Sequence, residues 1–222
     1  IMPCTAKKAE ALRPEMRSSG YQDVDIVITT RELGRMIRET GIDFASLQPE
    51  EFDSPLGRSS GAGVIFGTTG GVMEAALRTV ADKVTGEDLP QVEYKAVRGM
   101  GTVREASLTL AGQEVRIAVV HTLKAARAML ESIKAGKADY HFIEVMACPG
   151  GCIGGGGQPV PVDAEVRKAR REALFDCDEA CEIRKSHENP DIIELYESWL
   201  GKPLSEKSHH LLHTHFTPQK RI

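Results

Sequence analysis

Five cysteines are the residues of this sequence with the most distinctive chemistry, and two of them share an unusual loop. Cys148 and Cys152 lie four residues apart beside the six glycines of residues 150–157. Glycine lets the backbone approach a bulky ligand closely and adopt positive φ. Thiolates are soft ligands that suit Zn, Cu(I) or an iron–sulfur cluster. A buried cysteine is often only a small core residue, but that role would leave the glycine-rich loop unexplained.

Cys4 belongs with this pair because it also lies in a motif-like segment, residues 2–10 (MPCTAKKAE). We predict a helix over residues 3–17, so Cys4 should lie near a helix N-terminus, where the dipole favours a thiolate or an anionic cluster. Lys7 follows one turn later and can offer a charged donor to the same ligand. The Cys-x-x-x-Cys spacing, with no neighbouring histidine, counts against zinc. An iron–sulfur cluster on these three thiols needs a fourth ligand from elsewhere.

The elements that must position these thiols alternate between apolar strands and amphipathic helices. Strands separated by helices predict an α/β lobe with a mainly parallel sheet flanked by helices, in which sites gather where strands end and helices begin. The predicted strands are residues 24–30, 64–66, 94–98, 103–110, 114–121 and 142–147. The predicted helices are residues 3–17, 31–40, 72–84, 123–134, 164–185, 192–200 and 208–215.

The composition is that of an ordinary globular protein, with 41% hydrophobic and 27% charged residues among 222, so a sizeable core can form. A net charge of −4 without a long basic run indicates neither nucleic acid nor a membrane surface as partner, and no apolar stretch could span a bilayer. The odd cysteine count and the lack of a secretory signal favour reduced thiols and a cytoplasmic location. Because a motif follows Ile1 directly, we expect one piece of a longer subunit.

Two segments of the chain resemble signature segments of the iron-only (di-iron) hydrogenases nearly letter for letter. Residues 2–10 resemble the second signature of that family and residues 144–159 (EVMACPGGCIGGGGQP) resemble the third. The resemblance extends to residues 66–77 and 185–190 and so covers effectively the whole chain. The first signature, with the fourth cubane cysteine and the proton-relaying cysteine, is absent. The upstream half of the same subunit is therefore an expected partner.

The resemblance implies the fold, the cofactor and the activity. The chain would be the C-terminal part of the two-lobed H-cluster domain, with an α/β lobe over about residues 1–160 and a helical segment over about 161–222. The H-cluster is a 4Fe–4S cubane joined through a cysteine sulfur to a di-iron unit with CO, cyanide and a bridging dithiolate. The implied reaction is the reversible oxidation of H2 to protons and electrons. Ferredoxin or NAD(P)-linked flavoprotein and iron–sulfur subunits would carry the electrons.

The resemblance also implies a role for each matching residue. Cys4, Cys148 and Cys152 would bind the cubane, and the thiolate of Cys152 would be shared with the di-iron unit. Lys7 would donate a hydrogen bond to the cyanide on the distal iron. Such donors and the burial of the centre tune its chemistry.

Four further residues would form the walls of an apolar, water-poor pocket for CO and cyanide. Pro3 would offer its carbonyl and ring, Met2 and Met146 would pack against the di-iron unit, and Phe66 would shield the pocket near the bridging CO. Thr68 and Ala9 depart from the residues common in the family, where alanine and a larger apolar residue stand, and neither departure looks disabling.

Two other hypotheses remain open. Hydrogenase-like cluster-assembly or sensory proteins are non-catalytic, and the assembly proteins keep a cubane without the di-iron unit. Lys7, Met146 and the run of residues 154–159 favour the catalytic type, because a cubane alone needs no cyanide donor. An orphan fragment without activity of its own is the third hypothesis.

Some side chains have a functional and a structural interpretation. Cys177 and Cys181 are four apart on a predicted helix and could bind a metal or form a redox pair, although packing is the commoner role. Glu10 and Glu144 could relay protons or hydrogen-bond the motif backbone.

The C-terminal histidines have two interpretations as well. His209 and His213 could bind a metal at i and i+4. We favour an amphipathic docking helix with Leu211 and Leu212 on its apolar face.

Overall fold

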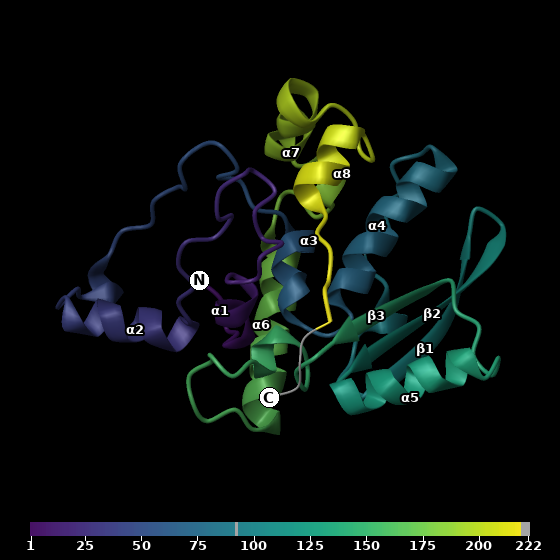
Figure 1. The fold of residues 1–222 in the computed structure, drawn as a ribbon, viewed down its shortest axis with the longest axis horizontal. Coiled ribbons are helices and arrows are strands. Elements are labelled where there is room, and N and C mark those ends of the chain that lie inside the picture. The colour runs from purple at the N-terminus through teal and green to yellow at the C-terminus, as the bar shows by residue number, and fades with distance from the viewer. Residues whose placement is uncertain (92, 219–222) are drawn as a thin grey trace. The chain divides into compact units, whose positions relative to one another are not determined.

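The computed structural model describes residues 1–91 and 93–218, and the chain divides into two compact units. The third signature-like segment crosses from one unit into the other after Gly155. Unit 1 consists of Ile1–Glu51, Gly156–Pro159 and Pro190–Ile222, and unit 2 of Phe52–Gly155 and Val160–Asn189. Figure 1 labels their elements. Among the helices that the structure describes, none combines the length and apolar character that a membrane span requires.

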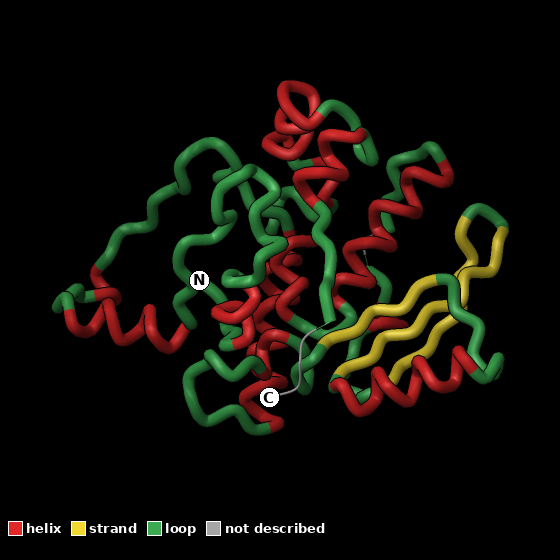
Figure 2. Tube along the Cα trace, in the orientation of Figure 1, coloured by secondary structure: helices red, strands yellow, loops and turns green. Residues whose placement is uncertain are grey.

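Unit 2 is built on a sheet of three strands in the order β1-β2-β3, drawn in yellow in Figure 2. Strands β1 (Val103–Leu110) and β2 (Gln113–His121) lie where the sequence predicts strands and form an antiparallel hairpin. Strand β3 (Phe142–Met146) pairs in parallel with β2 after the crossover helix α5 (Leu123–Lys134). The α/β class is confirmed, and within it the sheet is mixed, with one antiparallel and one parallel pair.

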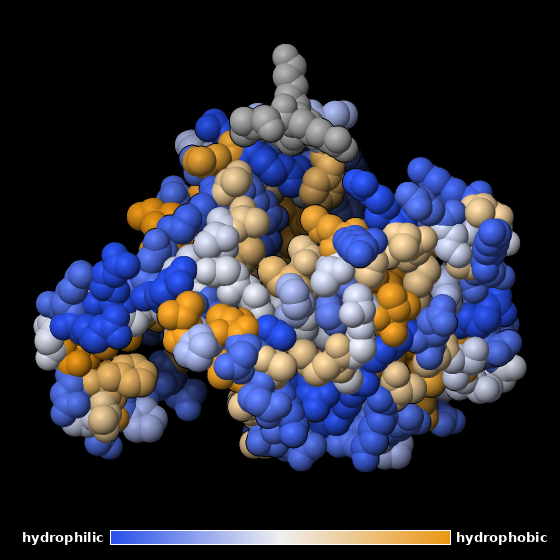
Figure 3. Space-filling model, turned by 90° about the horizontal axis from the view of Figure 1, so that it is seen from below, coloured by the Kyte–Doolittle hydropathy of each residue, from blue (hydrophilic) through white to orange (hydrophobic). Residues whose placement is uncertain are grey.

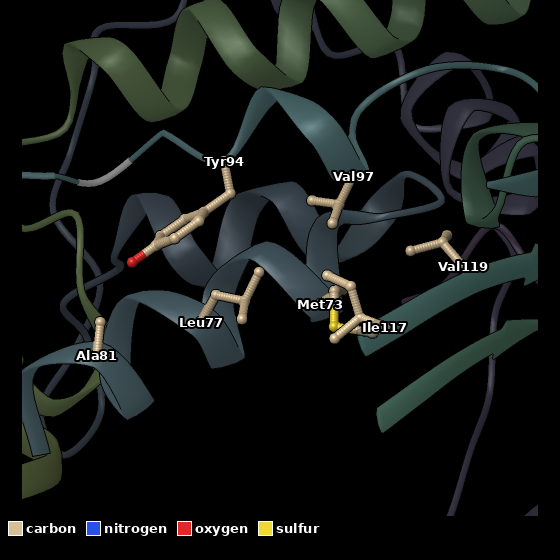
Figure 4. Packing of buried hydrophobic residues seen from close by; sticks show 7 residues of the cluster. All are labelled: Met73, Leu77, Ala81, Tyr94, Val97, Ile117 and Val119. Carbon is tan, nitrogen blue, oxygen red and sulfur yellow. The ribbon is translucent and has the colours of Figure 1, made fainter. Parts of the chain in front are cut away.

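The alternating side chains of β2 build a core on both faces of the sheet. Helix α4 (Gly71–Thr85) covers the face of Ile117 and Val119. Ala118 and Val120 point the other way, as the period of two in a strand requires, and pack with residues of α5. The first cluster, shown in Figure 4, comprises Met73, Leu77, Ala81, Tyr94, Val97, Ile117 and Val119. The parallel strand end and the N-terminus of α4 therefore meet at one edge of unit 2.

A buried ion network joins α4 to helix α6 (Ala164–Ala180). The guanidinium of Arg78, fully buried, donates to Asp178 at 2.7 and 2.8 Å and to Glu74 at 2.9 Å. Arg98 and Arg184 extend the network, at 2.7 Å from Glu74 and 2.6 Å from Asp178. Burial opposes charge on Asp178, but the hydrogen bonds from Arg78 and Arg184 prevail and lower the pKa of its carboxyl.

The segment of residues 185–190 is fixed at the C-terminal end of α4. The Lys185 ammonium lies 2.6 Å from Asp82 and donates to the carbonyl of Leu89 at 2.8 Å. His187 contacts Asp82 at 3.1 Å. Asp82, His187 and Glu188 lie within 4.8 Å of one another, a spacing that could hold a cation, but Lys185 already supplies the positive charge there. This family-like segment therefore has a structural role.

Unit 1 contains short helices: α1 (Ala6–Glu10), α2 (Thr30–Glu39), α7 (Pro190–Leu195), a π-helical turn (Tyr196–Leu200) and α8 (Glu206–Leu212). Helix α2 begins with a capping box, in which Thr29 accepts from the N–H of Glu32 and the Glu32 carboxylate accepts from the N–H of Thr29. The N-cap is thus Thr29, and the helix begins one residue before the predicted range of 31–40.

Three predicted strands are wrong. Residues 24–30 form only an isolated bridge between Met2 and Thr29, residues 61–67 are helical, and residues 95–97 form a 3₁₀ turn. In the second case Ser60 starts the helix by accepting from the N–H of Gly63. Short apolar runs do not distinguish a strand from a buried helical turn.

Two predicted helices are too long. Helix α1 has five residues instead of extending to residue 17, because the chain turns before Pro14, which lacks an N–H. Helix α6 ends at Ala180, where Cys181 becomes extended, rather than near residue 185.

Figure 3 shows a surface that is mostly hydrophilic, with hydrophobic groups scattered among the polar ones. Unit 1 nevertheless exposes several large apolar side chains, including Leu12 at 76% and Ile26 at 78%. Singly exposed apolar residues are ordinary, but side chains this open are candidates for contact with further protein.

We predict that Arg78→Met lowers the free energy of unfolding by about 3–5 kcal/mol, because it leaves buried carboxylates without a shared cation. Denaturant titration measures the change. Arg116→Met is the matched control, since Arg116 forms an exposed pair with Asp139 and should cost at most about 1 kcal/mol. Equal losses in the two variants would contradict the importance of the buried network.

Candidate metal centre

The loop of Cys148 and Cys152 follows β3 and is rigidly hydrogen-bonded within unit 2. The N–H of Gly151 donates to the carbonyl of Cys148 at 3.0 Å, and that of Gly155 donates to the carbonyl of Cys152 at 2.9 Å. The N–H of Thr69 donates to the carbonyl of Gly150 at 2.9 Å. Both cysteines are half-buried and present as thiols. The loop therefore holds two soft donors in a fixed backbone frame.

Close backbone contact explains why this loop needs glycine. A Cβ on Gly151, whose φ is +92°, would lie 2.7 Å from the nitrogen of Thr69. A Cβ on Gly154 would lie 2.1 Å from the carbonyl oxygen of Pro149. The sequence suggested that these glycines make room for a ligand, but here they make room for the protein's own backbone.

Two buried polar atoms near the loop have no hydrogen-bond partner in the part of the chain that the structure describes. They are Oγ1 of Thr68, which is fully buried, and Nδ1 of His121, whose other ring nitrogen lies 3.2 Å from the carbonyl oxygen of Met100. His121 pairs in register with Met146 at the ends of β2 and β3. Unsatisfied buried groups are costly, so this edge of unit 2 suits a ligand with polar or charged atoms.

Glu144 has a clear structural contact. Its buried carboxylate accepts from the N–H groups of Gly70 at 2.6 Å and Met73 at 2.7 Å, and so caps the N-terminus of α4. Burial raises the pKa of Glu144, although these N–H groups and Arg104 oppose that shift. Of the two roles that the sequence left open, the structure supports backbone capping directly.

Cys4 lies in unit 1, two residues before α1, and is half-buried. The N–H of Gly157 donates to the carbonyl of Pro3 at 3.2 Å. A Cβ on Gly157 would be 3.1 Å from the nitrogen of Cys4 and 2.7 Å from Thr29 Cγ2. The end of the third signature-like segment thus packs directly on the start of the second. Because α1 has only five residues, the helix dipole contributes less at Cys4 than the predicted long helix would.

Lys7 has an ionic partner within its own helix. Its ammonium lies 2.6 Å from the carboxylate of Glu10, with both side chains about 40% exposed (42% and 36%). Lys7 and Glu10 border a cavity of about 170 Å³ that Met2 also lines. The other lining residues are apolar: Ile1, Ala11, Met16, Val24, Ile26 and Val27. A cationic donor therefore stands at the edge of an apolar space.

The predicted site residues fall into two groups, one in each unit. Unit 1 holds Met2, Pro3, Cys4 and Lys7, and unit 2 holds Phe66, Met146, Cys148 and Cys152. The unit 1 residues are neighbours along the chain. The unit 2 residues lie in two segments that the hydrogen bond from Thr69 to Gly150 joins. Their convergence on one cofactor stays a prediction. The donor set of half-buried thiols, with orphaned polar atoms beside the unit 2 loop, fits a thiolate-bound iron–sulfur cluster.

Comparison with known families decides the class of protein. A family model described as "Iron only hydrogenase large subunit, C-terminal domain" matches residues 1–156. The chain belongs to the iron-only hydrogenases. A second family model, "Iron hydrogenase small subunit", matches residues 164–219 of this hydrogenase chain. The proposed division of domains near residue 160 lies between these matches but stays a prediction.

Named relatives agree with this class. The NADP-reducing hydrogenase subunit HndD of Solidesulfovibrio fructosivorans is 55% identical over the whole chain, which spans 38% of that protein. Iron hydrogenase 1 of Clostridium pasteurianum is 45% identical over 96% of the chain, again 38% of the relative. A structure of FeFe-hydrogenase HydA1 from Chlamydomonas reinhardtii has a TM-score of 0.78 at 42% identity, covering 97% of this chain and 61% of that one. The chain thus spans less than two thirds of these relatives.

A second kind of relative is also similar. The cytosolic iron-sulfur assembly component 3 of Rattus norvegicus is 35% identical over the whole chain and 48% of its own length. Family membership therefore implies iron–sulfur cofactors for this hydrogenase-like chain, and it does not by itself distinguish catalysis from cluster assembly.

Several residues that shape the site were missed from the sequence. The Thr29–Glu32 capping box was readable as Thr-x-x-Glu before an apolar run, and it positions the strand-like contact with Met2. The burial of His121 and of the Thr68 hydroxyl, which has no hydrogen-bond partner among the described residues, could not be predicted from the sequence, because only the fold shows it.

We predict that Gly151→Ala disrupts the cysteine loop, because the methyl group would meet the backbone of Thr69. Gly112→Ala is the matched control, since Gly112 also has positive φ (+79°) but has open space around it. The control should lose about 1 kcal/mol in denaturant titration, whereas Gly151→Ala should lose more and bind less iron after reconstitution. The same loss of stability and iron in both variants would contradict the close-approach argument.

We predict a specific pH dependence for Glu144→Gln. Since burial raises the folded pKa of Glu144, its contribution to stability is present below the unfolded value of about 4.3 and lost as the pH rises through the folded value. The unfolding free energy of the original chain should therefore fall with pH relative to that of Glu144→Gln. Denaturant titrations across this window measure the difference, with the exposed Glu131→Gln as background. A difference that is constant with pH would show that capping keeps the carboxyl ionised.

Proposed function

We propose that this chain is the downstream part of the H-cluster domain of a catalytic iron-only hydrogenase, which interconverts H2 with protons and electrons. The bound H-cluster, a 4Fe–4S cubane joined to a di-iron unit, supplies the bond cleavage and the electron transfer. The observation that carries the proposal is the Lys7 ammonium at the edge of an apolar cavity in unit 1, because an electron-transfer cubane alone needs no such donor.

Cys4, Cys148 and Cys152 hold the cubane in this proposal, and Cys152 shares its thiolate with the di-iron unit. The rigid loop supports this role, since its hydrogen bonds fix the backbone on both sides of Cys152. The contact of Gly157 with Pro3 and Cys4 adds support, because it holds the downstream end of the loop segment beside the third thiol's own segment.

Lys7 donates to the cyanide of the distal iron in this proposal. The ion pair with Glu10 holds the ammonium at the edge of the cavity that both residues line. The apolar lining of the cavity supports the role. Ile26 in that lining is 78% exposed here, and a charge-assisted hydrogen bond becomes stronger once further protein covers such side chains and excludes water.

Met2, Pro3, Phe66 and Met146 form the walls of the di-iron pocket in this proposal. Met2 lines the unit 1 cavity, and the Pro3 carbonyl is anchored by Gly157. Met146 ends β3 half-buried, and Phe66 is 46% exposed on its 3₁₀ turn, so both have surface to offer a ligand. Methionine suits such walls because its sulfur is polarisable and its chain adapts.

The upstream half of the subunit is the first partner. The chain spans 38% of two named hydrogenases, and unit 1 exposes apolar side chains such as Leu12 and Ile26 that further protein would cover. Electron partners are ferredoxin or NAD(P)-linked subunits, and the name of HndD, NADP-reducing, supports the latter. We place the enzyme in the cytoplasm on its reduced thiols, although a relative that is 54% identical is named periplasmic.

A cluster-assembly protein is the alternative function. The 35% identity to the rat assembly component over the whole chain supports it. Such a protein would use the three thiols for a cubane and would have no task for Lys7. The alternative therefore makes a different prediction for that residue.

We predict that Lys7→Gln changes or abolishes the cyanide bands in the infrared spectrum of the matured protein joined to its upstream half. Hydrogen evolution should fall roughly 10–100-fold, the equivalent of one charge-assisted hydrogen bond. The matched control is Lys8→Gln, which removes the same charge from the neighbouring residue, paired with Glu32 at 2.9 Å. The control should keep both the bands and the activity.

The outcomes separate the hypotheses. A cubane signal in electron paramagnetic resonance without any CO or cyanide bands would support the assembly alternative. Normal bands with equal activity in Lys7→Gln and Lys8→Gln would refute the role of Lys7. No cubane at all in the original sequence would refute the three-thiol site.

A further inference from the structure

Besides the cysteine thiols, the chain has a pair of nitrogen donors at the end of α8 in unit 1. His209 and His213 have their Nδ1 atoms 2.7 Å apart, with ring centroids 4.5 Å apart and ring planes at 86°. Both side chains are exposed. We propose that His209 and His213 form a chelating site for a divalent transition-metal ion, of the nickel or copper type, with water completing the coordination.

The backbone of the helix end brings the two rings together. The N–H of His209 donates to the carbonyl of Ser205 at 2.8 Å, and the N–H of His213 donates to the carbonyl of His209 at 3.2 Å. His213 is the C-cap residue, with φ −112° and ψ 150°, so it leaves the helix while its amide still belongs to the last turn. The four-residue spacing places the rings on one side of the helix, and the His210 ring starts about 100° away around the axis.

The closeness of the nitrogens is the second observation. Two imidazole nitrogens at 2.7 Å cannot both present lone pairs without something positive between them, either a proton on one ring or a shared cation. In water, a proton on one ring is enough to hold the two nitrogens together before any metal binds. Imidazole is also the commonest protein ligand for zinc, copper, iron and nickel. The pair is therefore preorganised for a cation rather than assembled by it.

The separation of the nitrogens can be compared with that in a metal chelate. With metal–nitrogen bonds of about 2.0–2.1 Å, a right-angled chelate has its nitrogens about 2.9 Å apart, and a tetrahedral one about 3.3 Å. The 2.7 Å between the nitrogens is a hydrogen-bond distance, and the rings would move apart less to form the right-angled chelate than the tetrahedral one. Square-planar and octahedral ions such as Cu²⁺ and Ni²⁺ prefer that angle, whereas Zn²⁺ in structural protein sites prefers the tetrahedral one.

Two residues of opposite charge lie in the first half of α8, before the pair. The ammonium of Lys207 keeps its positive charge over the Trp199 ring, 4.6 Å from its centroid, and Glu206 in the first turn carries a negative charge. The site also differs from the thiol set in its donor atoms, which are imidazole nitrogens rather than thiolate sulfurs.

Metal binding would stabilise the start of the C-terminal tail. The described residues after His213, 214–218, form neither helix nor strand and contact the region that follows α1: Thr217 donates to Glu15 at 2.5 Å, and the Phe216 ring lies 4.3 Å from the Arg13 guanidinium carbon. A chelate between His209 and His213 would hold the root of this tail against the last turn of α8. A seven-residue helix is marginal alone, so such a link should slow the opening of its end.

Calorimetric titration of the full chain with Ni²⁺ tests the proposal. His209→Asn and His213→Asn should each weaken one Ni²⁺ equivalent by roughly tenfold or more, because one ligand loses the chelate advantage. His210→Asn is the matched control, since it removes a neighbouring exposed imidazole and should leave that equivalent unchanged. The cysteines are the same in every variant, so any metal that they bind cancels in the comparison.

The results decide the matter in both directions. Equal weakening by all three substitutions would show non-specific binding by a histidine-rich tail and would overturn the site, as would no weakening by any of them. Hydrogen exchange gives an independent measurement: Ni²⁺ should protect the amides of residues 213–217 in the original chain and in His210→Asn, and not in His213→Asn. Protection in His213→Asn would also overturn the proposal.

Discussion

Direct backbone contact between the cysteine loop and the turn before α4 fixes where two of the three thiols lie. The carbonyl of Gly150 accepts from Thr69, and Gly151 fits against that turn without room for a side chain. The turn in turn depends on α4, whose N-terminus is capped by Glu144 from β3. Hydrogen bonds thus connect β3 to α4, and the turn before α4 to the cysteine loop. The thiols are positioned by these main-chain contacts rather than by their own side-chain packing.

The helices and strands that the sequence predicted correctly are those with strong local patterns. The 103–121 hairpin has alternating burial on β1 and two residues of positive φ at its turn, Ala111 and Gly112. Helices α4 and α5 have long amphipathic patterns and were predicted within a residue or two of their ends. The runs at 64–66 and 94–98 were too short to carry a period, so apolar composition alone suggested strands where the chain forms helical turns.

Sequence motifs identified the candidate site residues, but they could not predict which other residues surround them. Nothing in the sequence pairs Arg78 with Asp178, because the two are one hundred positions apart and meet only through the packing of α4 and α6. The ion pair of Lys7 with Glu10 was within reach of the sequence, since a three-residue spacing on a helix brings such side chains together. The sequence suggested that the loop glycines make room for a ligand. Only the fold shows that Gly151 and Gly154 make room for the protein's own backbone.

The region that matches the small-subunit family contributes to both compact units. Helix α6 belongs to unit 2 through its buried ion pair with Arg78, while α7, α8 and the tail belong to unit 1. Residues 160–163 connect this region covalently to the preceding loop. A gene break at that point would leave these contacts in place and would make association bimolecular, so that folding would depend on the concentration of two chains. Fusion of the two parts, as in this polypeptide, guarantees equal supply of both and removes that dependence.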